Sequence, residues 1–324
     1  MVKEVHLAHT QGFCAGVSSA IDIVEIALEK YGIPLYVRHE IVHNTSIIKD
    51  LESRGVVFVE ELGDVPDDHA VVFSAHGTAP DVYAAAEKRG LHFIDATCPL
   101  VTKVHRQATR YSKRSTHTIL IGHRGHQELI GTSGYVHPDL LHIVEDESDI
   151  ENLDLDPELE IGVLTQTTLS VSDTSHLIQK LQKKFPKIIT GNKEDICYAT
   201  QNRQDAVKEL TQTCDVIIIC GSPTSSNSNR LKETAQNEGV ESYIIDLVDE
   251  FNPKWLEDKT KVGISSGASV PSYIVNDLVK LILDLNPKAV LFQKESVEKG
   301  ISFPLPTEIK EFKDQKQKTQ IVNT

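Results

Sequence analysis

The sequence has no long hydrophobic run and too few basic residues to balance its acidic ones. Its most aliphatic stretch, 216–220, has about five residues, whereas a membrane-spanning helix needs ~20. The 33 Lys and Arg residues against 47 Asp and Glu residues give a net charge of −14. Proteins that bind nucleic acids or anionic membranes normally carry a basic surface, so we expect neither partner. The first residues, MVKEVHLAHTQGFC, lack the apolar core of a secretory signal, so we expect a cytoplasmic protein.

Cysteine is scarce, and the common cofactor motifs are absent. Five cysteines in 324 residues do not form the disulfide framework of a small secreted domain. The C-x-x-C pairs of zinc ribbons are missing, as are the glycine-rich signatures for nucleoside triphosphates and dinucleotides. Histidine, by contrast, is frequent, and several of the 14 histidines lie in the short segments HEIVH, SAHG and GHRGH. This clustering indicates a role other than packing.

Short aliphatic segments alternate with segments of helical periodicity, which predicts an α/β fold with small, mainly parallel sheets. We expect helices after each of three cysteines, at positions 14, 98 and 197, and a last helix over 271–285. The predicted strands are 34–38, 56–59, 70–74, 92–95, 118–121, 141–144, 161–164, 187–190, 215–220, 242–245 and 261–264.

A weak internal repeat divides the chain. DATCPLVTKVHRQA and DICYATQNRQDAV each pass from Asp through Cys into a helix, and GFCAGVSSAIDIVEIA has the same Cys-then-helix form. Each is followed by two strands with polar residues at their ends. We therefore expect three α/β lobes, 1–97, 98–195 and 196–306, that meet at one central site, because ligands of such sheets bind at strand carboxyl ends. The polar tail, 307–324, is expected to be a surface extension or disordered.

One cysteine per lobe occupies a setting that favours metal binding. Cys14, Cys98 and Cys197 each precede a predicted helix, where free N–H groups and the helix dipole lower the pKa of a thiol. Three thiolates do not complete a structural zinc site unless a histidine joins them, so an iron–sulfur cluster fits better. A four-iron cluster with three thiolates would keep one open, Lewis-acidic iron. Cys214 and Cys220 lack this setting and are expected to be buried structural thiols.

Polar side chains gather just beyond the predicted strands. His43, His76 and His126 lie in matching positions, beside small residues. A second group would serve equally as helix N-caps and consists of Ser225, Ser226, Asn227 and Ser269. Helix N-termini, hydroxyl groups and imidazoles together make a suitable pocket for phosphate groups.

Glu128 lies in the same histidine-rich loop as His126, and such a carboxyl group can donate a proton if its pKa is raised. Thr167, within TQTT, is a candidate for extending a proton path. A strand-to-helix turn would also explain that segment.

Eight segments occur in a familiar order: GFCAGV, VRHEIVHN, SAHG, DATCPLVTKVH, TQTTLSV, DICYATQNRQ, SSNSNRL and SGAS. Together, over about 5–303, they closely resemble the 4-hydroxy-3-methylbut-2-enyl diphosphate reductase family. The resemblance implies a trefoil of three lobes around a 4Fe–4S cluster held by Cys14, Cys98 and Cys197. It also implies reductive removal of the substrate hydroxyl, bound at the open iron. The products would be isopentenyl and dimethylallyl diphosphate, in the last step of the non-mevalonate pathway.

The resemblance also implies roles for the polar residues. Glu128 would deliver protons, and Thr167 would lie beside the substrate hydroxyl. The diphosphate would be held by His43, His76, His126, Ser225, Ser226, Asn227 and Ser269. An external carrier such as ferredoxin or flavodoxin would supply electrons to what we expect to be a monomer. The family pattern GHPEVEGT reads GHQELIGT here, with Gln127 and Ile130 as departures, and Pro223 and Thr224 stand where basic or polar residues are common.

Two other functions compete with this interpretation. A metal-dependent phosphate-ester hydrolase would use the histidines as metal ligands and the cysteines only for structure. A non-catalytic iron–sulfur redox sensor would hold the cluster but turn over no allylic diphosphate. The absence of a basic helix-turn-helix segment disfavours a DNA-binding sensor.

Overall fold

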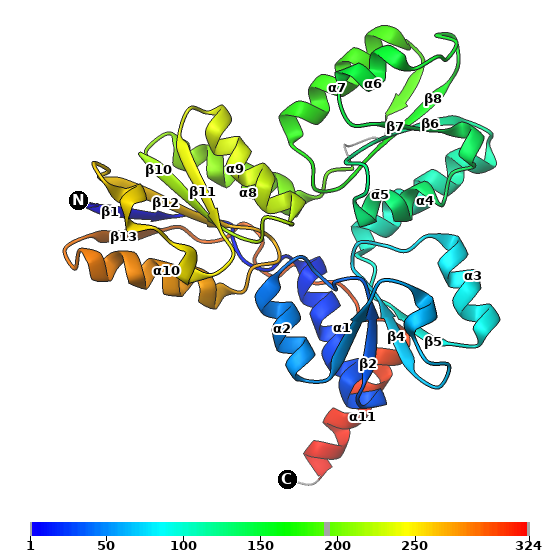
Figure 1. Ribbon diagram of the computed structural model, residues 1–324, viewed down its shortest axis with the longest axis horizontal. Helices are drawn as coiled ribbons and strands as arrows, with labels where there is room; N and C mark the ends of the chain where they lie inside the picture. Colours follow the sequence, from blue (N-terminus) through cyan, green and yellow to red (C-terminus); the bar gives the residue numbers. More distant parts are fainter. Residues whose placement is uncertain (1, 191–194, 323–324) are drawn as a thin grey trace.

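Three separate parallel sheets form the framework of the protein, and Figure 1 shows them as three lobes around a common centre. The computed structural model describes residues 2–190 and 195–322. The predicted α/β class with three small parallel sheets is confirmed. In each sheet, three successive strands follow the same rule: the second strand is added on one side of the first, and the third strand is added on its other side.

The elements of each lobe follow one another along the chain. The first lobe contains α1 (Ala15–Tyr31), β2 (Leu35–Arg38), α2 (Thr45–Ser53), β3 (Val56–Val59), β4 (Ala70–Phe73), α3 (Pro80–Arg89) and β5 (His92–Asp95). The second contains α4 (Pro99–Lys113), β6 (His117–Ile121), α5 (Gln127–Ser133), β7 (Leu141–Val144), α6 (Glu147–Asn152), β8 (Ile161–Thr165), α7 (Val171–Lys184) and β9 (Ile188–Thr190). The third contains α8 (Tyr198–Thr211), β10 (Val216–Cys220), α9 (Ser226–Asn237), β11 (Glu241–Ile245), β12 (Lys261–Ser266), α10 (Ser272–Leu285) and β13 (Val290–Gln293).

The N-terminal strand completes the third sheet. The strand orders are β3-β2-β4-β5, β7-β6-β8-β9 and β11-β10-β12-β1-β13. Strand β1 (Glu4–Leu7) therefore occupies in the third sheet the place that β5 and β9 occupy in the other two. It pairs in parallel with β12, with Val5 opposite Val262. A division of the sequence at residue 97 does not account for this strand, because β1 precedes the first lobe in sequence but lies in the third.

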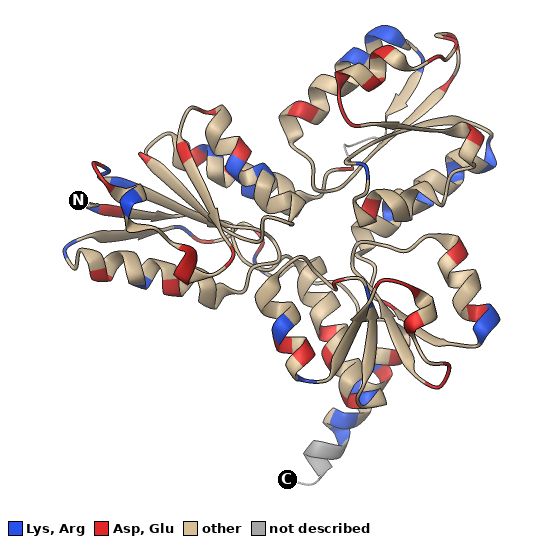
Figure 2. Ribbon diagram, in the orientation of Figure 1, with Lys and Arg blue, Asp and Glu red and all other residues tan. Residues whose placement is uncertain are grey.

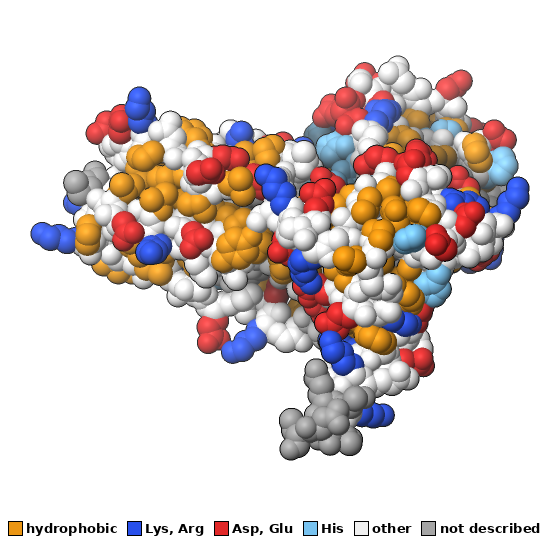
Figure 3. Space-filling view, turned by 60° about the horizontal axis from the view of Figure 1, so that its bottom comes forward, with side chains coloured by type: hydrophobic (Ala, Val, Ile, Leu, Met, Phe, Trp, Pro, Cys, Tyr) orange, Lys and Arg blue, Asp and Glu red, His pale blue; other side chains and the backbone are white. Residues whose placement is uncertain are grey.

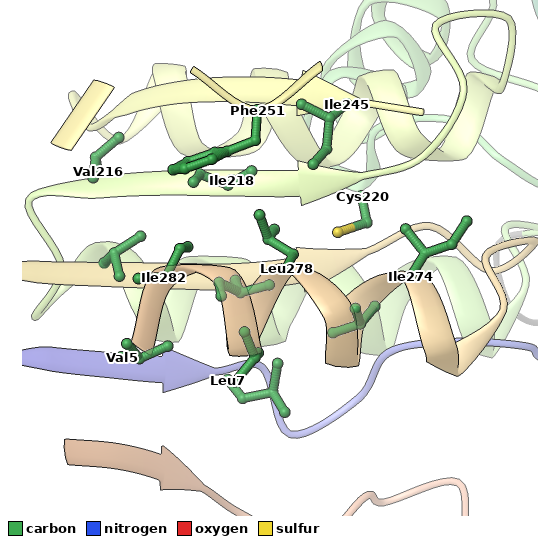
Figure 4. Close-up of a cluster of buried hydrophobic side chains, with 14 of the residues drawn as sticks. Val5, Leu7, Val216, Ile218, Cys220, Ile245, Phe251, Ile274, Leu278 and Ile282 are labelled. Atoms are coloured by element: carbon green, nitrogen blue, oxygen red, sulfur yellow. The ribbon is translucent and has the colours of Figure 1, made fainter. Parts of the chain in front are cut away.

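Helices cover both faces of the sheets, so the central strands are continuously apolar. All five residues of β10, VIIIC, are buried. Figure 4 shows one face of the third lobe, where Val5 and Leu7 of β1 lie close to Leu278 and Ile282 of α10. Both cysteines expected to be structural, Cys214 and Cys220, are buried in the apolar clusters of this lobe, which is the setting we predicted for them.

The tail differs from expectation. The polar composition of 307–324 predicted a surface extension or disorder, but 307–322 form helix α11 (Thr307–Val322). Ile309 is fully buried in the core of the first lobe, and Lys30 contacts Glu308 at 2.7 Å. One buried apolar side chain and a few ion pairs thus dock this helix, and most of its residues up to 318 are exposed.

Charged residues lie mainly on the outer parts of the lobes (Figure 2). On the face shown in Figure 3, acidic and basic side chains are interspersed, without a broad basic area. No helix in the described part of the chain is long and apolar enough to cross a membrane.

Candidate active site at the junction of the lobes

One cavity of about 120 Å³ is lined by side chains from all three lobes. The strand order reverses between β2 and β4, between β6 and β8, and between β10 and β12. Ligands of open parallel sheets bind beyond the strand ends at such reversals, and the cavity is lined from these loops. It contains every site residue expected from the sequence: Cys14, His43, His76, Cys98, His126, Glu128, Thr167, Cys197, Ser225, Ser226, Asn227 and Ser269.

Each of the three cysteines lies where the chain passes from one lobe to the next. Its backbone N–H donates to a loop carbonyl of the lobe that the chain is leaving. Cys14 donates to Ala268 at 3.1 Å, Cys98 to Ala75 at 3.0 Å and Cys197 to Thr167 at 3.0 Å. The thiols come together because the threefold arrangement brings these crossings to one centre.

All three cysteines are helix N-caps, yet burial dominates their acidity. Cys14 Sγ accepts from the Val17 N–H at 3.5 Å, and Cys197 Sγ accepts from the Thr200 N–H at 3.4 Å. Burial nevertheless raises the pKa of Cys98 to about 12 and that of Cys197 to about 11, with the neighbouring thiols adding to the rise. The free N–H groups at the helix starts do lower the pKa of Cys98 and Cys197, as the sequence predicted, but burial outweighs them and the net shift is upward. A cationic metal in the cavity would reverse the balance, since a coordinated thiol is deprotonated.

Gly16 leaves room beside two of the three thiols. A Cβ atom at Gly16 would lie 2.8 Å from Cys98 Sγ and 3.7 Å from Cys14 Sγ, so glycine keeps this space open. Within the described ranges, no three His, Cys, Asp or Glu side chains are placed to hold one metal ion. A set of three thiols drawn from distant segments is the donor chemistry of an iron–sulfur cluster.

The three histidines form a compact cluster beside the thiols. The rings of His43 and His76 stack with centroids 4.3 Å apart, and His126 meets them edge-on at 5.8 and 6.0 Å. Burial, followed by repulsion from neighbouring imidazoles, places the pKa of His76 well below its usual value and lowers that of His126 to about 4. These two rings are neutral at pH 7 until an anion joins them.

Hydrogen bonds to Nδ1 set the orientation of the three imidazole rings. His126 Nδ1 accepts from the Glu128 N–H at 3.1 Å. His43 Nδ1 lies 2.9 Å from the Glu40 carboxylate, and His76 Nδ1 lies 3.4 Å from the Ser74 hydroxyl. With each Nδ1 engaged, the Nε2 atoms are the ones that can bind a ligand.

The third lobe adds hydroxyl and amide groups. Ser225 Oγ caps α9 by accepting from the Ser228 N–H at 3.3 Å, and Ser269 Oγ donates to the His43 carbonyl at 2.9 Å. Ser226 Oγ donates to the Thr168 carbonyl at 3.3 Å. Asn227 is only 5% exposed, and neither its Oδ1 nor its Nδ2 has a partner among the described residues. A water molecule or a polar ligand in the cavity would supply the missing partners of this amide.

Glu128 is the buried acid of the site. It is 3% exposed and accepts hydrogen bonds from Thr167, at 2.6 Å from the backbone N–H and at 3.0 Å from Oγ1. Burial raises its pKa to about 7, although the two Thr167 hydrogen bonds oppose the rise. A carboxyl group with this pKa can hold and release a proton near neutral pH.

The departures from the family motif leave this geometry in place. Gln127 is the first residue of α5, and the side chain of Ile130 in the same helix is 51% exposed. Glu128 therefore keeps its burial and its contacts. Asn229 Nδ2 donates to the Pro223 carbonyl at 2.6 Å, and the Thr224 hydroxyl lies 2.9 Å from that of Ser222, so both substituted residues are integrated into the loop.

Several cavity residues were missed in the sequence. Thr200 Oγ1 lies 3.2 Å from Cys197 Sγ, and its spacing of three residues from a helix cap could have revealed it. Gln166 lies outside the cavity lining but was also missed, and its Nε2 donates to the hydroxyl groups of Thr168 and Ser226, which links two lobes. Phe303 lines the cavity from a segment far along the chain, for which the sequence carried no signal.

Comparison with known proteins identifies the family. The family model described as LytB protein matches residues 5–283. The 4-hydroxy-3-methylbut-2-enyl diphosphate reductase of Chromohalobacter salexigens is 48% identical over 311 residues, which cover 95% of this chain and 98% of that protein. The enzyme of the same name from Marinobacter nauticus is 47% identical over 310 residues, with the same coverage.

A solved structure agrees with these sequence relatives. The E-1-hydroxy-2-methyl-but-2-enyl-4-diphosphate reductase from Plasmodium falciparum superposes with a TM-score of 0.94 at 36% identity, and covers 98% of this chain and 100% of its own. The resemblance recognised from eight short motifs is thus confirmed. This chain belongs to the LytB protein family.

Proposed function

We propose that this protein reduces (E)-4-hydroxy-3-methylbut-2-enyl diphosphate to isopentenyl and dimethylallyl diphosphate, the last step of the non-mevalonate isoprenoid pathway. The observation that carries the proposal is the single cavity lined by three helix-capping thiols, three clustered imidazoles and a buried acid. In this reaction a C–O bond breaks and a C–H bond forms. Two electrons and two protons enter, and the hydroxyl group leaves as water.

A 4Fe–4S cluster would be held by Cys14, Cys98 and Cys197. When bound, such a cluster supplies electrons one at a time and, with only three protein ligands, a Lewis-acidic iron. Support comes from the all-thiol donor set and from Gly16, which keeps the space between two of the thiols open. The electrons would come from an external carrier such as ferredoxin or flavodoxin.

The histidines, serines and asparagine would bind the diphosphate. His126 Nε2 can donate to a phosphate oxygen from the neutral ring, because its Nδ1 accepts from the Glu128 N–H. Proximity of the anion favours protonation of the rings, and a protonated ring donates from Nε2 even where, as in His43, Nδ1 already donates to a carboxylate. Asn227 would gain a partner for its buried Nδ2. The other members of this set are Ser225, Ser226 and Ser269. Binding at several points would orient the allylic part of the substrate toward the thiols and the acid.

Glu128 would deliver the proton that turns the hydroxyl group into water. Its pKa of about 7 keeps it partly protonated under ordinary conditions, and the Thr167 hydroxyl is within hydrogen-bond reach. We therefore assign Thr167 a place beside the substrate hydroxyl, where it would hold this group near the acid. A protonated hydroxyl group is a far better leaving group than hydroxide.

We also propose a cytoplasmic, monomeric enzyme. All five cysteines are free, which suits a reducing compartment. Gel filtration with light scattering of the anaerobic protein tests the oligomeric state.

Anaerobic turnover tests the proposed function. The purified protein is assayed for iron, acid-labile sulfide and visible absorbance, and is then given the substrate with a chemical reductant. The proposal predicts about four irons and four sulfides per chain and formation of both products. Bound zinc or manganese without sulfide, with release of phosphate, would favour the hydrolase. A cluster without turnover would favour the sensor.

A further inference from the structure

The first and second lobes meet through two segments that both carry site residues. The loop after β4 holds His76 and continues through 77–80. Helix α5 is capped by His126 and carries Glu128 in its first turn. The position of His76 relative to Glu128 therefore depends on how this loop packs against this helix.

Gly131 allows helix α5 to approach the backbone of the His76 loop closely. Gly131 lies one helical turn after Glu128, and a Cβ atom there would lie 2.8 Å from the carbonyl oxygen of Gly77 and 3.1 Å from its carbonyl carbon. Both are backbone atoms, so no side-chain rotation could relieve the clash. Ordinary contact begins at 3.4 Å, and a methyl group would separate the helix and the loop by about 0.6 Å (3.4 − 2.8 Å).

Gly134 makes a second contact with the same loop. A Cβ atom there would lie 2.6 Å from Ala79 Cβ and 3.1 Å from Pro80 Cδ. The hydroxyl group of Tyr135, the next residue, donates to the Thr78 carbonyl at 3.1 Å. The loop is thus fixed to the end of α5 by close packing and by a hydrogen bond.

The loop also packs against α4. Gly77 has a φ of +95°, and a Cβ atom on it would lie 2.6 Å from His105 Cε1 and 2.9 Å from Val101 Cγ1. The buried His105 ring stacks on Tyr135 with centroids 4.3 Å apart. The His76 loop is therefore enclosed by two helices that leave no room for a side chain at position 77.

We propose that Gly131 and Gly77 are positioning residues, which set the distance between the imidazole cluster and the acid by letting helix and loop approach at backbone contact. Alanine is intrinsically favoured over glycine inside a helix, so glycine at the centre of the short α5 has a packing reason. The inference rests on the proposed function, which gives His76 and Glu128 their roles. Displacements below 1 Å matter there, because misplacement of about 1 Å can cost about 100-fold in rate.

The first test compares Gly131→Ala with Gly63→Ala under anaerobic conditions. Gly63 is exposed, with no atom within 4 Å of its added Cβ, so it controls for the substitution itself. For Gly131→Ala we expect kcat to fall about 10- to 100-fold. The iron content should be unchanged, and the dissociation constant for inorganic pyrophosphate should rise by a smaller factor than kcat falls, because separation of loop and helix moves His76 and His126 apart but leaves the other proposed phosphate-binding groups in place. A kcat within about twofold of wild type would overturn the inference.

The second test exploits the contact at Gly134, and decides the matter even if Gly131→Ala does not fold. Gly134→Ala should lower kcat, and adding Ala79→Gly should restore part of it, because the nearest obstructing atom, Ala79 Cβ, is then gone and only the looser contact with Pro80 Cδ at 3.1 Å remains. A double variant no faster than Gly134→Ala would overturn the inference, since the loss would not come through the loop. Wild-type protein without turnover would contradict the proposed function itself, and this inference with it.

Discussion

The backbone N–H of Cys98 donates to the carbonyl oxygen of Ala75 at 3.0 Å, where the chain leaves the first lobe for the second. The same bond recurs at the other two cysteines. Each thiol is therefore placed by two lobes, the one that accepts this bond and the one whose helix begins there. A disturbance of any crossing should affect the metal site, while cysteines inside a lobe should not matter to it.

Substitution of the cysteines tests this distinction. Cys98→Ser should abolish assembly of the cluster, because hydroxyl groups are poor ligands for iron–sulfur centres. Cys214→Ser is the matched control, since Cys214 is a buried thiol outside the cavity. Iron, acid-labile sulfide and visible absorbance are measured for both variants after anaerobic purification. Full colour in Cys98→Ser would contradict the ligand assignment.

Glu128→Gln should stop turnover without removing the site. Glutamine keeps an acceptor for the Thr167 N–H but cannot donate a proton at useful rates, so we expect kcat to fall about 10²- to 10⁴-fold. Cluster content and pyrophosphate affinity should match wild type. Ser46→Ala, a substitution outside the cavity lining, controls for expression and handling. Near-normal turnover in Glu128→Gln would remove Glu128 from the mechanism.

The raised pKa of Glu128 also predicts how the stability of the metal-free protein depends on pH. The folded protein holds this proton up to about pH 7, whereas the unfolded chain releases it near 4.5. The free energy of unfolding therefore loses a contribution as pH rises between these values, by at most about 3 kcal/mol. Urea unfolding at pH 5 and pH 8 should show that the free energy of unfolding of Glu128→Gln, relative to that of wild type, is higher at pH 8 than at pH 5. An equal difference at both values would contradict the burial effect.

Anion binding should take up protons. His76 and His126 have lowered pKa values because burial and neighbouring imidazoles disfavour their charged forms, and a diphosphate would offset that cost. Affinity for inorganic pyrophosphate should thus increase as pH falls from 8 to 6. Calorimetry in two buffers of different ionisation enthalpy would report the uptake directly. Binding of pyrophosphate without proton uptake would contradict this prediction and show that the neutral imidazole rings bind the anion.

Much of this site could be predicted from the sequence because most of its residues lie in short, recognisable sequence patterns. Aliphatic runs predicted β2, β4, β6, β8, β10 and β12 to within two residues, and the repeated Cys-then-helix pattern singled out Cys14, Cys98 and Cys197. The short motifs then supplied the remaining polar residues of the cavity.

What the sequence did not predict depends on distant contacts. Strand β1 joins the third sheet through pairing with β12, more than 250 residues away, and its four residues carry no sign of this. Ile309 is the one fully buried apolar side chain among the described side chains of helix α11, and a single such residue gives no periodicity. The acidity of Cys98 is set by burial among three lobes, so its helix position suggested the wrong direction. The unpartnered amide of Asn227 likewise appears only once the loops are assembled.

The most direct measurement of the central claim is the location of iron in a crystal of anaerobically prepared protein, by anomalous scattering at the iron edge. We predict several iron positions within bonding distance of the Sγ atoms of Cys14, Cys98 and Cys197, and none at the histidines. Iron bound to His43, His76 or His126, or thiols without iron in a protein that still turns over the substrate, would contradict the account.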